Sequence, residues 1–197
     1  MVGILLSLSP GCRTDLDLQT PPEPADCELP LVYEKSPADA LEGTGWHRIY
    51  VQGGSATPDA DGRYGMGEHR TDIATGDHFL LSAGALVEWT YPVLDPITGL
   101  VSVHIARVDV PGLVARYELF LVRDDELIEM FSIDDEEEGD QGYVPFEACW
   151  SAPAAVGDPG PDDFLLMRVT NLSGGELGVV VNAPDYYTWI DVEVSEP

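Results

Sequence analysis

Basic residues are scarce in this chain. Nine Lys and Arg stand against 36 Asp and Glu among 197 residues, which gives a formal net charge of -27 at pH 7. A protein that binds a nucleic-acid backbone needs clusters of Lys and Arg to replace phosphate counterions, and the sequence has no such cluster. Anionic membrane surfaces are disfavoured for the same electrostatic reason. The composition therefore excludes nucleic acid as a partner and indicates a solubilising acidic surface or a cation-binding protein.

Long hydrophobic runs and helical periods are also missing. No stretch reaches the roughly 20 apolar residues that a transmembrane helix needs, and no long stretch shows the 3.6-residue period of an amphipathic helix. Hydrophobic residues nevertheless make up 44% of the chain, and four residues are Trp. A core can therefore form, disorder throughout is excluded, and one domain is the natural expectation for this length.

Alternation of apolar and polar residues indicates β-strands along most of the chain. Between residues 114 and 123, Tyr117 and Leu119 fall on one face and Arg116 on the other, as half-buried strands require. Comparable patterns cover 47–52, 86–91, 101–110, 165–170, 177–181 and 187–194. The pattern predicts an all-β fold, an antiparallel β-sandwich or jelly roll of about nine or ten strands, with a closed barrel as the alternative.

Three local features refine this prediction. The apolar phase changes between Ile105 and Ala106, which predicts either a β-bulge or a bend of the strand between sheets. The two glycines at 174–175 predict a hairpin turn. Arg48 and Tyr50 on the first strand alternate with apolar residues, as does Asp191 on the last. These side chains are expected on faces turned away from the core, with Asp191 in solvent.

The amino-terminal residues 2–11 carry no charge, include four large aliphatic residues, and end directly before Cys12. Residues 8–12 read Leu-Ser-Pro-Gly-Cys, with a small residue before the Cys. The segment resembles the end of a bacterial lipoprotein signal peptide with its lipobox. The resemblance implies a lipidated Cys12, an acyl anchor in a lipid bilayer, and a bacterial cell-envelope location at the outer membrane or facing the periplasm. The alternative is an edge strand, because the aliphatic residues alternate.

The resemblance also organises the chain and its cysteines. Residues 1–11 become a signal-peptide remnant, 12–26 an acidic Pro-rich tether that begins with the lipidated Cys, and 27–197 a single β-sandwich domain. With Cys12 lipidated, Cys27 and Cys149 remain of the three cysteines and are predicted to form a disulfide in an oxidising compartment. Two separate buried thiols are the alternative.

Acidic clusters are candidates for cation binding. Hard cations such as calcium prefer clustered carboxylate oxygens. One candidate set is the acidic run Asp134, Asp135, Glu136 and Asp140, and a second is Asp59 and Asp61 in a Gly-containing turn. An ordinary solvated loop explains the first set equally, and a turn explains the second.

Motifs for catalysis are few. The two histidines His69 and His78, with Asp72 between them, offer zinc or iron ligands, but their spacing matches no metal motif. The sequence contains neither HExxH nor GxSxG. An enzyme, either metal-dependent or glycan-cleaving, therefore remains an alternative without a specific motif.

Aromatic residues near the carboxyl terminus give the clearest functional indication. Sugar rings stack on aromatic side chains, and polar neighbours fix their hydroxyl groups. The candidate ligand-binding residues are Trp189, Tyr186 and Tyr187, with Asp185 and Asn182 beside them. We predict an envelope-anchored binding or assembly module for a glycan or an envelope protein. The alternatives are a calcium-stabilised adhesion or structural domain, and rings that merely cover a sheet edge.

Overall fold

The computed structural model describes residues 46–53, 56–67, 77–94, 96–109, 112–136, 142–151, 159–183 and 186–194. This part of the chain is all-β and contains no helix, so none of its elements is a membrane-spanning helix. Its strands are β1 (Trp46–Val51), β2 (Tyr64–Gly67), β3 (Asp77–Leu81), β4 (Leu86–Pro92), β5 (Ile97–Asp109), β6 (Val114–Arg123), β7 (Glu126–Glu136), β8 (Gly142–Ser151), β9 (Phe164–Asn171), β10 (Leu177–Ala183), β11 (Tyr186–Tyr187) and β12 (Trp189–Val194).

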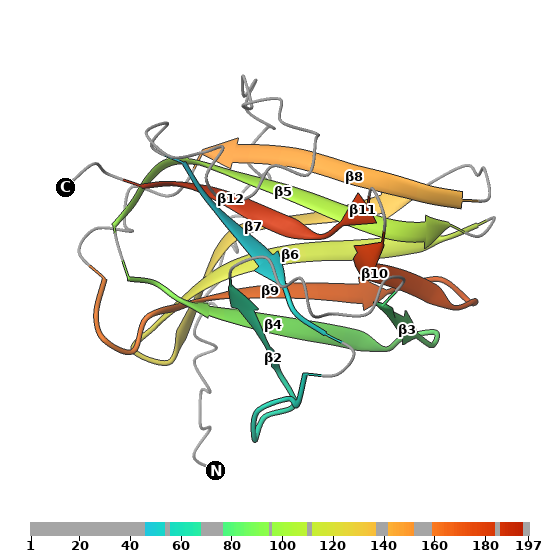
Figure 1. Ribbon diagram of the computed structural model, residues 1–197, viewed down its shortest axis with the longest axis horizontal. Coiled ribbons are helices and arrows are strands. Elements are labelled where there is room, and N and C mark those ends of the chain that lie inside the picture. The colour runs from blue at the N-terminus through green and yellow to red at the C-terminus, as the bar shows by residue number, and fades with distance from the viewer. Residues whose placement is uncertain are drawn as a thin grey trace, which may run out of the picture.

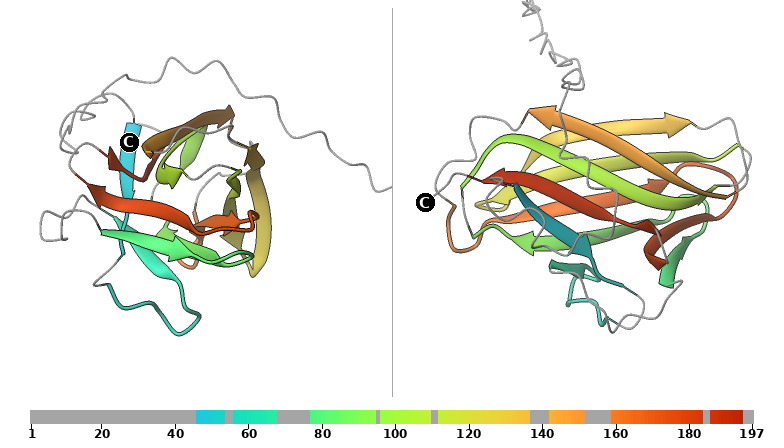
Figure 2. Two further views of the ribbon diagram at one scale, coloured as in Figure 1. Left: turned by 90° about the vertical axis from the view of Figure 1, so that its right-hand side faces the viewer. Right: turned by 45° about the horizontal axis from the view of Figure 1, so that its top comes forward.

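The strands form two facing layers (Figures 1 and 2). Sheet A contains β1, β12, β5 and β8 in that order, with β10, β3 and β11 continuing from the far end of β5. Sheet B has the order β4, β9, β6 and β7. The short strand β2 pairs antiparallel with β1 and parallel with β4, so it joins the two sheets along one edge.

The predicted fold class is confirmed: the protein is an antiparallel β-sandwich. Twelve strands lie in the described residues, against the nine or ten expected. The strands that no predicted range covers include β11, which has two residues, and β2, which has four, but also β8, which has ten. Alternation over two or four residues cannot be distinguished from chance, whereas hydrogen bonding to a neighbour defines such strands at once.

The core lies between the sheets and follows the predicted alternation. Tyr117 and Leu119 of β6 are fully buried, and Trp89 of β4 packs in the same cluster. Sheet A contributes Val103 and Ile190, also fully buried. Large inward side chains from both sheets interdigitate, which supplies most of the hydrophobic stabilisation of such a sandwich.

The predicted hairpin at residues 174–175 is wrong. Strand β9 pairs with β4 and β6 in sheet B, whereas β10 pairs with strands of sheet A, so this connection crosses from one sheet to the other. The buried side chain of Asn171 organises the crossing, because its Nδ2 donates to the carbonyls of Leu81 and Gly175. Two glycines therefore mark a turn here, but the partner strands depend on the whole fold.

The predicted bulge at Ile105 and Ala106 is also wrong, and so is its alternative, a bend of the strand between sheets, because every partner of β5 lies in sheet A. The register between β5 and β8 runs without a shift from Leu100 to Asp109. Strand β5 instead changes its other neighbour, from β12 at His104 to β10 beyond Ala106. Ile105 lies in the main core, while Ala106 packs with Val180 in a separate small cluster. The apolar phase changes because Ser102 and His104, buried on the same face earlier in β5, are polar, whereas Ala106 is apolar and packs on Val180.

Candidate functional site

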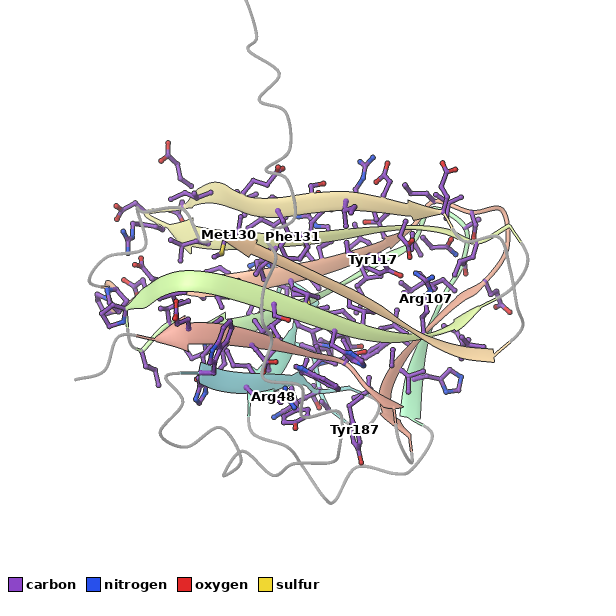
Figure 3. The ribbon with its side chains drawn as sticks, turned by 90° about the horizontal axis from the view of Figure 1, so that it is seen from above. Arg48, Arg107, Tyr117, Met130, Phe131 and Tyr187 are labelled. Atoms are coloured by element: carbon purple, nitrogen blue, oxygen red, sulfur yellow. The ribbon has the colours of Figure 1, made fainter. Side chains whose placement is uncertain are left out.

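The outer face of sheet A carries a cluster of polar and aromatic side chains. We call it the outer-face cluster, and its members are Arg48, Tyr50, His104, Tyr187, Trp189 and Asp191. Strand register builds its centre: Tyr50 lies opposite Trp189, which in turn lies opposite His104. In the next outward-facing row, Arg48 lies opposite Asp191. Strands β1, β5 and β12, far apart in the sequence, thus bring these five residues together. Figure 3 labels Arg48 and Tyr187 of the cluster.

Trp189 is fixed in one orientation by its neighbours. The imidazole of His104 stacks on the indole, with ring centroids 3.7 Å apart and planes 9° apart. The guanidinium carbon of Arg48, from the strand on the other side of β12, lies 4.5 Å from the indole centroid. The indole Nε1 donates a hydrogen bond of 3.1 Å to Asp191 Oδ2. Cation–π, stacking and hydrogen-bond contacts therefore fix the position and orientation of the indole ring.

A buried ion pair supports this arrangement. Arg48 Nε and Nη2 donate to the two carboxylate oxygens of Asp191 at 2.7 and 2.8 Å, and both side chains are about 95% buried (5% and 4% exposed). Burial by itself lowers the pKa of Arg48, but the hydrogen bonds and charge of Asp191 outweigh it, so the pKa lies above its ordinary value. The expectation that Asp191 lies in solvent is wrong, because its partner sits across the sheet at a register that only the fold sets.

Tyrosines extend the cluster from β1 to β11. The Tyr187 ring meets the Tyr50 ring edge to face, with centroids 6.1 Å apart and planes at 79°. Burial raises the pKa of Tyr50 above its ordinary value. Tyr187 and Trp189 are half-buried, so part of each ring meets solvent. Between them, the buried Thr188 hydroxyl donates to the Val180 carbonyl at 2.7 Å and fixes the junction of β11 and β12.

The structure brings two of the predicted ligand-binding residues together and adds four. Trp189 and Tyr187 belong to the cluster, whereas Asp185 lies outside the described residues. Asn182 and Tyr186 lie in the backbone pairing of β10 and β11, opposite Tyr187 and Ala183. Sequence reasoning missed the members Arg48, Tyr50, His104 and Asp191. The available signal was that Arg48 and Asp191 alternate with apolar residues on the first and last strands. A single sequence does not show that these two strands are neighbours.

Asp134 and Asp135 of the first predicted calcium set point to opposite faces of β7. Asp134 accepts hydrogen bonds of 2.5 and 2.8 Å from exposed Arg116, which lowers its pKa. Asp135 pairs with Arg107, a buried residue of sheet A that also donates to Tyr117 Oη at 2.8 Å (Figure 3). These carboxylates therefore bind arginines on two separate faces.

The remaining acidic candidates lie apart from this pair. Glu136 is exposed at the end of β7, and Asp140 lies outside the described residues. Asp59 and Asp61 organise a turn: Asp59 Oδ1 accepts from the backbone N–H groups of Asp61 and Arg63, both at 2.9 Å. Within the described ranges, no group of three or more His, Cys, Asp or Glu side chains is arranged to hold a metal.

The other predicted sites fall partly outside the described residues. His78 is exposed on β3, while His69 and Asp72 lie outside. Cys12 and Cys27 also lie outside, and Cys149 occupies a position on β8 opposite Ser102 of β5. Lipidation of Cys12 and a disulfide between Cys27 and Cys149 therefore stay predictions.

Comparison with known proteins found no matching family model and no matching curated protein. Among solved structures, a CocE/NonD family hydrolase from Staphylococcus aureus aligns over 76% of this chain with 6% identity and a TM-score of 0.48, and this chain covers 36% of that protein's length. The C-terminal CBM6 of LamC, a marine laminarinase from Zobellia galactanivorans, aligns over 75% of this chain and 98% of its own, with 15% identity and a TM-score of 0.35.

A carbohydrate-binding module, CBM36, in complex with calcium and xylotriose aligns over 73% of this chain and 92% of its own, with 13% identity and a TM-score of 0.32. Identities and TM-scores are low in all three comparisons, so they assign no ligand to this chain. The function has to be inferred from the outer-face cluster itself.

Proposed function

We propose that the protein is a non-catalytic module that binds a glycan at the outer-face cluster of sheet A. The observation that carries this proposal is the fixed, half-buried indole of Trp189, held by His104, Arg48 and Asp191 beside the half-buried ring of Tyr187. The faces of the indole are occupied by protein groups, so its exposed edge and the Tyr187 ring are the surfaces offered to a sugar.

Fixed aromatic groups suit ligands that combine apolar C–H faces with polar hydroxyl groups, such as sugar rings. A sugar places apolar C–H groups against an aromatic ring and hydrogen-bonds through its hydroxyls, which matches the half-buried ring of Tyr187 and its phenol group beside the exposed edge of the indole. Side chains that are ordered before binding lose less conformational entropy on binding, so the buried network around Trp189 increases affinity. Catalysis needs converging acid and base groups, and the cluster instead pairs its acid with an arginine.

A binding screen with matched variants tests this proposal. The protein is screened by thermal shift against a panel of soluble polysaccharides, since a ligand at a hundredfold over its dissociation constant adds about 2.7 kcal/mol to folded-state stability. Tyr187→Ala and Trp189→Ala should abolish the shift. Phe164→Ala removes a half-buried ring from the outer face of sheet B and should retain it. Equal binding by all three variants, or no shift with any glycan, contradicts the proposal.

The same screen tests calcium. The alternative of a calcium-stabilised domain requires that calcium raise the melting temperature and that a chelator lower it. Superimposable melts in calcium and chelator contradict calcium binding by the acidic set 134–140 and by Asp59 and Asp61 together.

Exposed leucines favour a second candidate function, assembly with an envelope protein. Leu86 and Leu172 lie near the same end of sheet B, at 51% and 43% exposed, and Leu94 is 71% exposed. Exposed apolar side chains stabilise a complex when a partner buries them. Leu86→Glu and Leu172→Glu should then abolish cross-linking to a partner in the envelope and leave glycan binding unchanged. Unchanged cross-linking contradicts this second function.

We also propose, from the sequence of residues 2–12, that the module is anchored in the bacterial envelope through lipidated Cys12. Metabolic labelling with palmitate should mark the full-length protein and fail with Cys12→Ser, which also should release the protein from membranes.

The predicted disulfide between Cys27 and Cys149 has its own test. When the protein is alkylated without reductant, mass spectrometry should find neither of these two cysteines alkylated. Two alkylated thiols in protein from an oxidising compartment contradict the disulfide.

A further inference from the structure

Every arginine in the described part of the chain is bound to a carboxylate. The pairs are Arg48 with Asp191, Arg63 with Asp61 and Glu88, Arg107 with Asp135, Arg116 with Asp134, Arg123 with Asp163, and Arg168 with Glu88 and Glu118. These pairs lie on both outer faces and in the interior of the sandwich. The described arginines therefore already have anionic partners within the protein.

The pair at the proposed binding site is the most completely buried of these, with both side chains 5% exposed or less. Arg48 is the arginine of the outer-face cluster, and its Nε and Nη2 both donate to Asp191. Recognition of a carboxylate or sulfate relies on such a two-pronged donation from Arg. A ligand anion at this site would have to displace Asp191 and leave its carboxylate buried without a partner, which is costly.

The net negative charge of the protein also disfavours an anionic ligand. The chain carries 36 acidic residues against nine basic ones, so a net charge of -27 surrounds any ligand that approaches. At an ionic strength of about 0.1 M this field extends roughly 10 Å from the surface, far enough to act on a polymer lying across a sheet. A polyanion is repelled on approach, an uncharged polymer is unaffected, and a polymer with amino groups is attracted.

We propose that the site selects uncharged or amino-bearing glycans and excludes glycans that carry carboxylate or sulfate groups. This inference rests on the proposed glycan-binding function and specifies the chemical class of its ligand. Two features carry it: the occupied guanidinium of Arg48 and the surplus of carboxylates over basic groups.

Matched polymer pairs with the same backbone test the inference. Suitable pairs are hydroxyethylcellulose with carboxymethylcellulose, dextran with dextran sulfate, and methyl-esterified with de-esterified polygalacturonan, and chitosan serves as the amino-bearing probe. At low ionic strength the uncharged member of the best-binding pair should bind at least about tenfold more tightly than its anionic counterpart. This preference should shrink in about 1 M salt, where the screening length falls to roughly 3 Å.

The outcomes separate this inference from the function on which it rests. Equal or tighter binding of the anionic member at low ionic strength, with or without calcium, overturns the selectivity while glycan binding stands. Binding to no member of any pair overturns the glycan-binding function and the selectivity with it. A preference for the uncharged member that does not change with salt overturns the electrostatic origin.

A variant that releases the guanidinium tests the first feature directly. Asp191→Asn leaves Arg48 charged without its carboxylate, so binding of the anionic member should increase several-fold relative to wild type. Asp134→Asn changes the net charge equally but releases Arg116 on the outer face of sheet B, so it should leave the preference unchanged. A folded Asp191→Asn without any gain overturns the role of Arg48. If that variant does not fold, the salt dependence of the wild-type preference decides the inference.

Discussion

The imidazole of His104 lies parallel to the indole of Trp189, with ring centroids 3.7 Å apart. The two residues are direct cross-strand neighbours on β5 and β12, so the register of the sheet sets this stack. Arg48 approaches the same indole from β1. The orientation of Trp189 is therefore determined by residues that lie 85 positions before it and 141 positions before it in the sequence.

Removing the stack should weaken the proposed glycan binding without removing the indole itself. In His104→Ala, Trp189 loses a contact worth about 0.5 to 1.5 kcal/mol, and its indole gains freedom that binding must then restrict. We expect a several-fold increase in the glycan dissociation constant and a changed tryptophan fluorescence spectrum. His78→Ala, at an exposed position on β3, is the control and should match wild type. An unchanged dissociation constant in His104→Ala would show that the stack has no role in binding.

The buried pair of Arg48 and Asp191 should be costly to break. Asp191→Asn leaves a buried guanidinium without its counter-charge, and we expect a loss of about 3 to 5 kcal/mol in the free energy of unfolding. Asp134→Asn breaks an exposed pair, with side chains 43% and 45% exposed, and should cost less than about 1 kcal/mol. Urea denaturation of both variants measures the difference. Similar losses in the two variants contradict the argument from burial.

The hydrogen bond between Arg107 and Tyr117, which joins the two sheets, should make a measurable contribution to the free energy of unfolding. Arg107 of sheet A donates to Tyr117 Oη of sheet B at 2.8 Å, and both residues are buried. Tyr117→Phe removes an acceptor of a charged donor, so the free energy of unfolding should fall by about 1.5 to 3 kcal/mol. Tyr64→Phe removes a hydroxyl from a half-buried ring that packs on Phe79 and should have little effect. Equal effects of the two substitutions would contradict a specific role for the Arg107 bond.

Two glycines provide a matched test of packing. A Cβ at Gly53 would collide with the ring of Phe79 and crowd Val181, whereas a Cβ at Gly65 would have only the flexible side chain of Gln52 at 4.0 Å. Gly53→Ala should therefore destabilise the fold by about 1 to 3 kcal/mol through overpacking. Gly65→Ala should be close to neutral. Thermal and urea unfolding of the two variants compare them, and a neutral Gly53→Ala would show that the Phe79 ring can move aside.

The pH dependence of stability should reflect Asp163. Hydrogen bonds from Arg123, and one from the Gly160 amide, hold the pKa of Asp163 below its ordinary value. A carboxyl whose pKa is lower in the folded state stabilises folding above its unfolded pKa of about 3.9. This contribution is lost as the pH falls through the unfolded value toward the folded one.

Urea denaturation across the acid range measures the effect. In wild type the free energy of unfolding should fall as the pH drops below about 5, and Asp163→Asn should reduce that slope. Glu126→Gln removes an exposed carboxyl, changes the net charge equally, and serves as the control with the wild-type slope. An unchanged slope in Asp163→Asn contradicts the assignment.

The sequence alone determined the fold class and much of the core. Alternation along β6 correctly placed Tyr117 and Leu119 inside, and the pattern of β12 placed Ile190 inside and Trp189 outside. Such predictions succeed because side-chain direction in a strand is a local property with a period of two residues. The scarcity of basic residues, likewise readable from composition, is one of the two observations behind the proposed class of ligand.

Only the tertiary structure decided what lies on the outer face. Arg48 and Asp191 are separated by 143 positions, and their pairing exists because the first and last described strands are neighbours in one sheet. The same pairing converts Asp191 from an expected solvent-facing charge into a buried one. Strand order and register depend on contacts between distant segments, which no local period encodes. The outer-face cluster is therefore a property of the assembled sheet. The sequence contains its residues but does not show that they lie together.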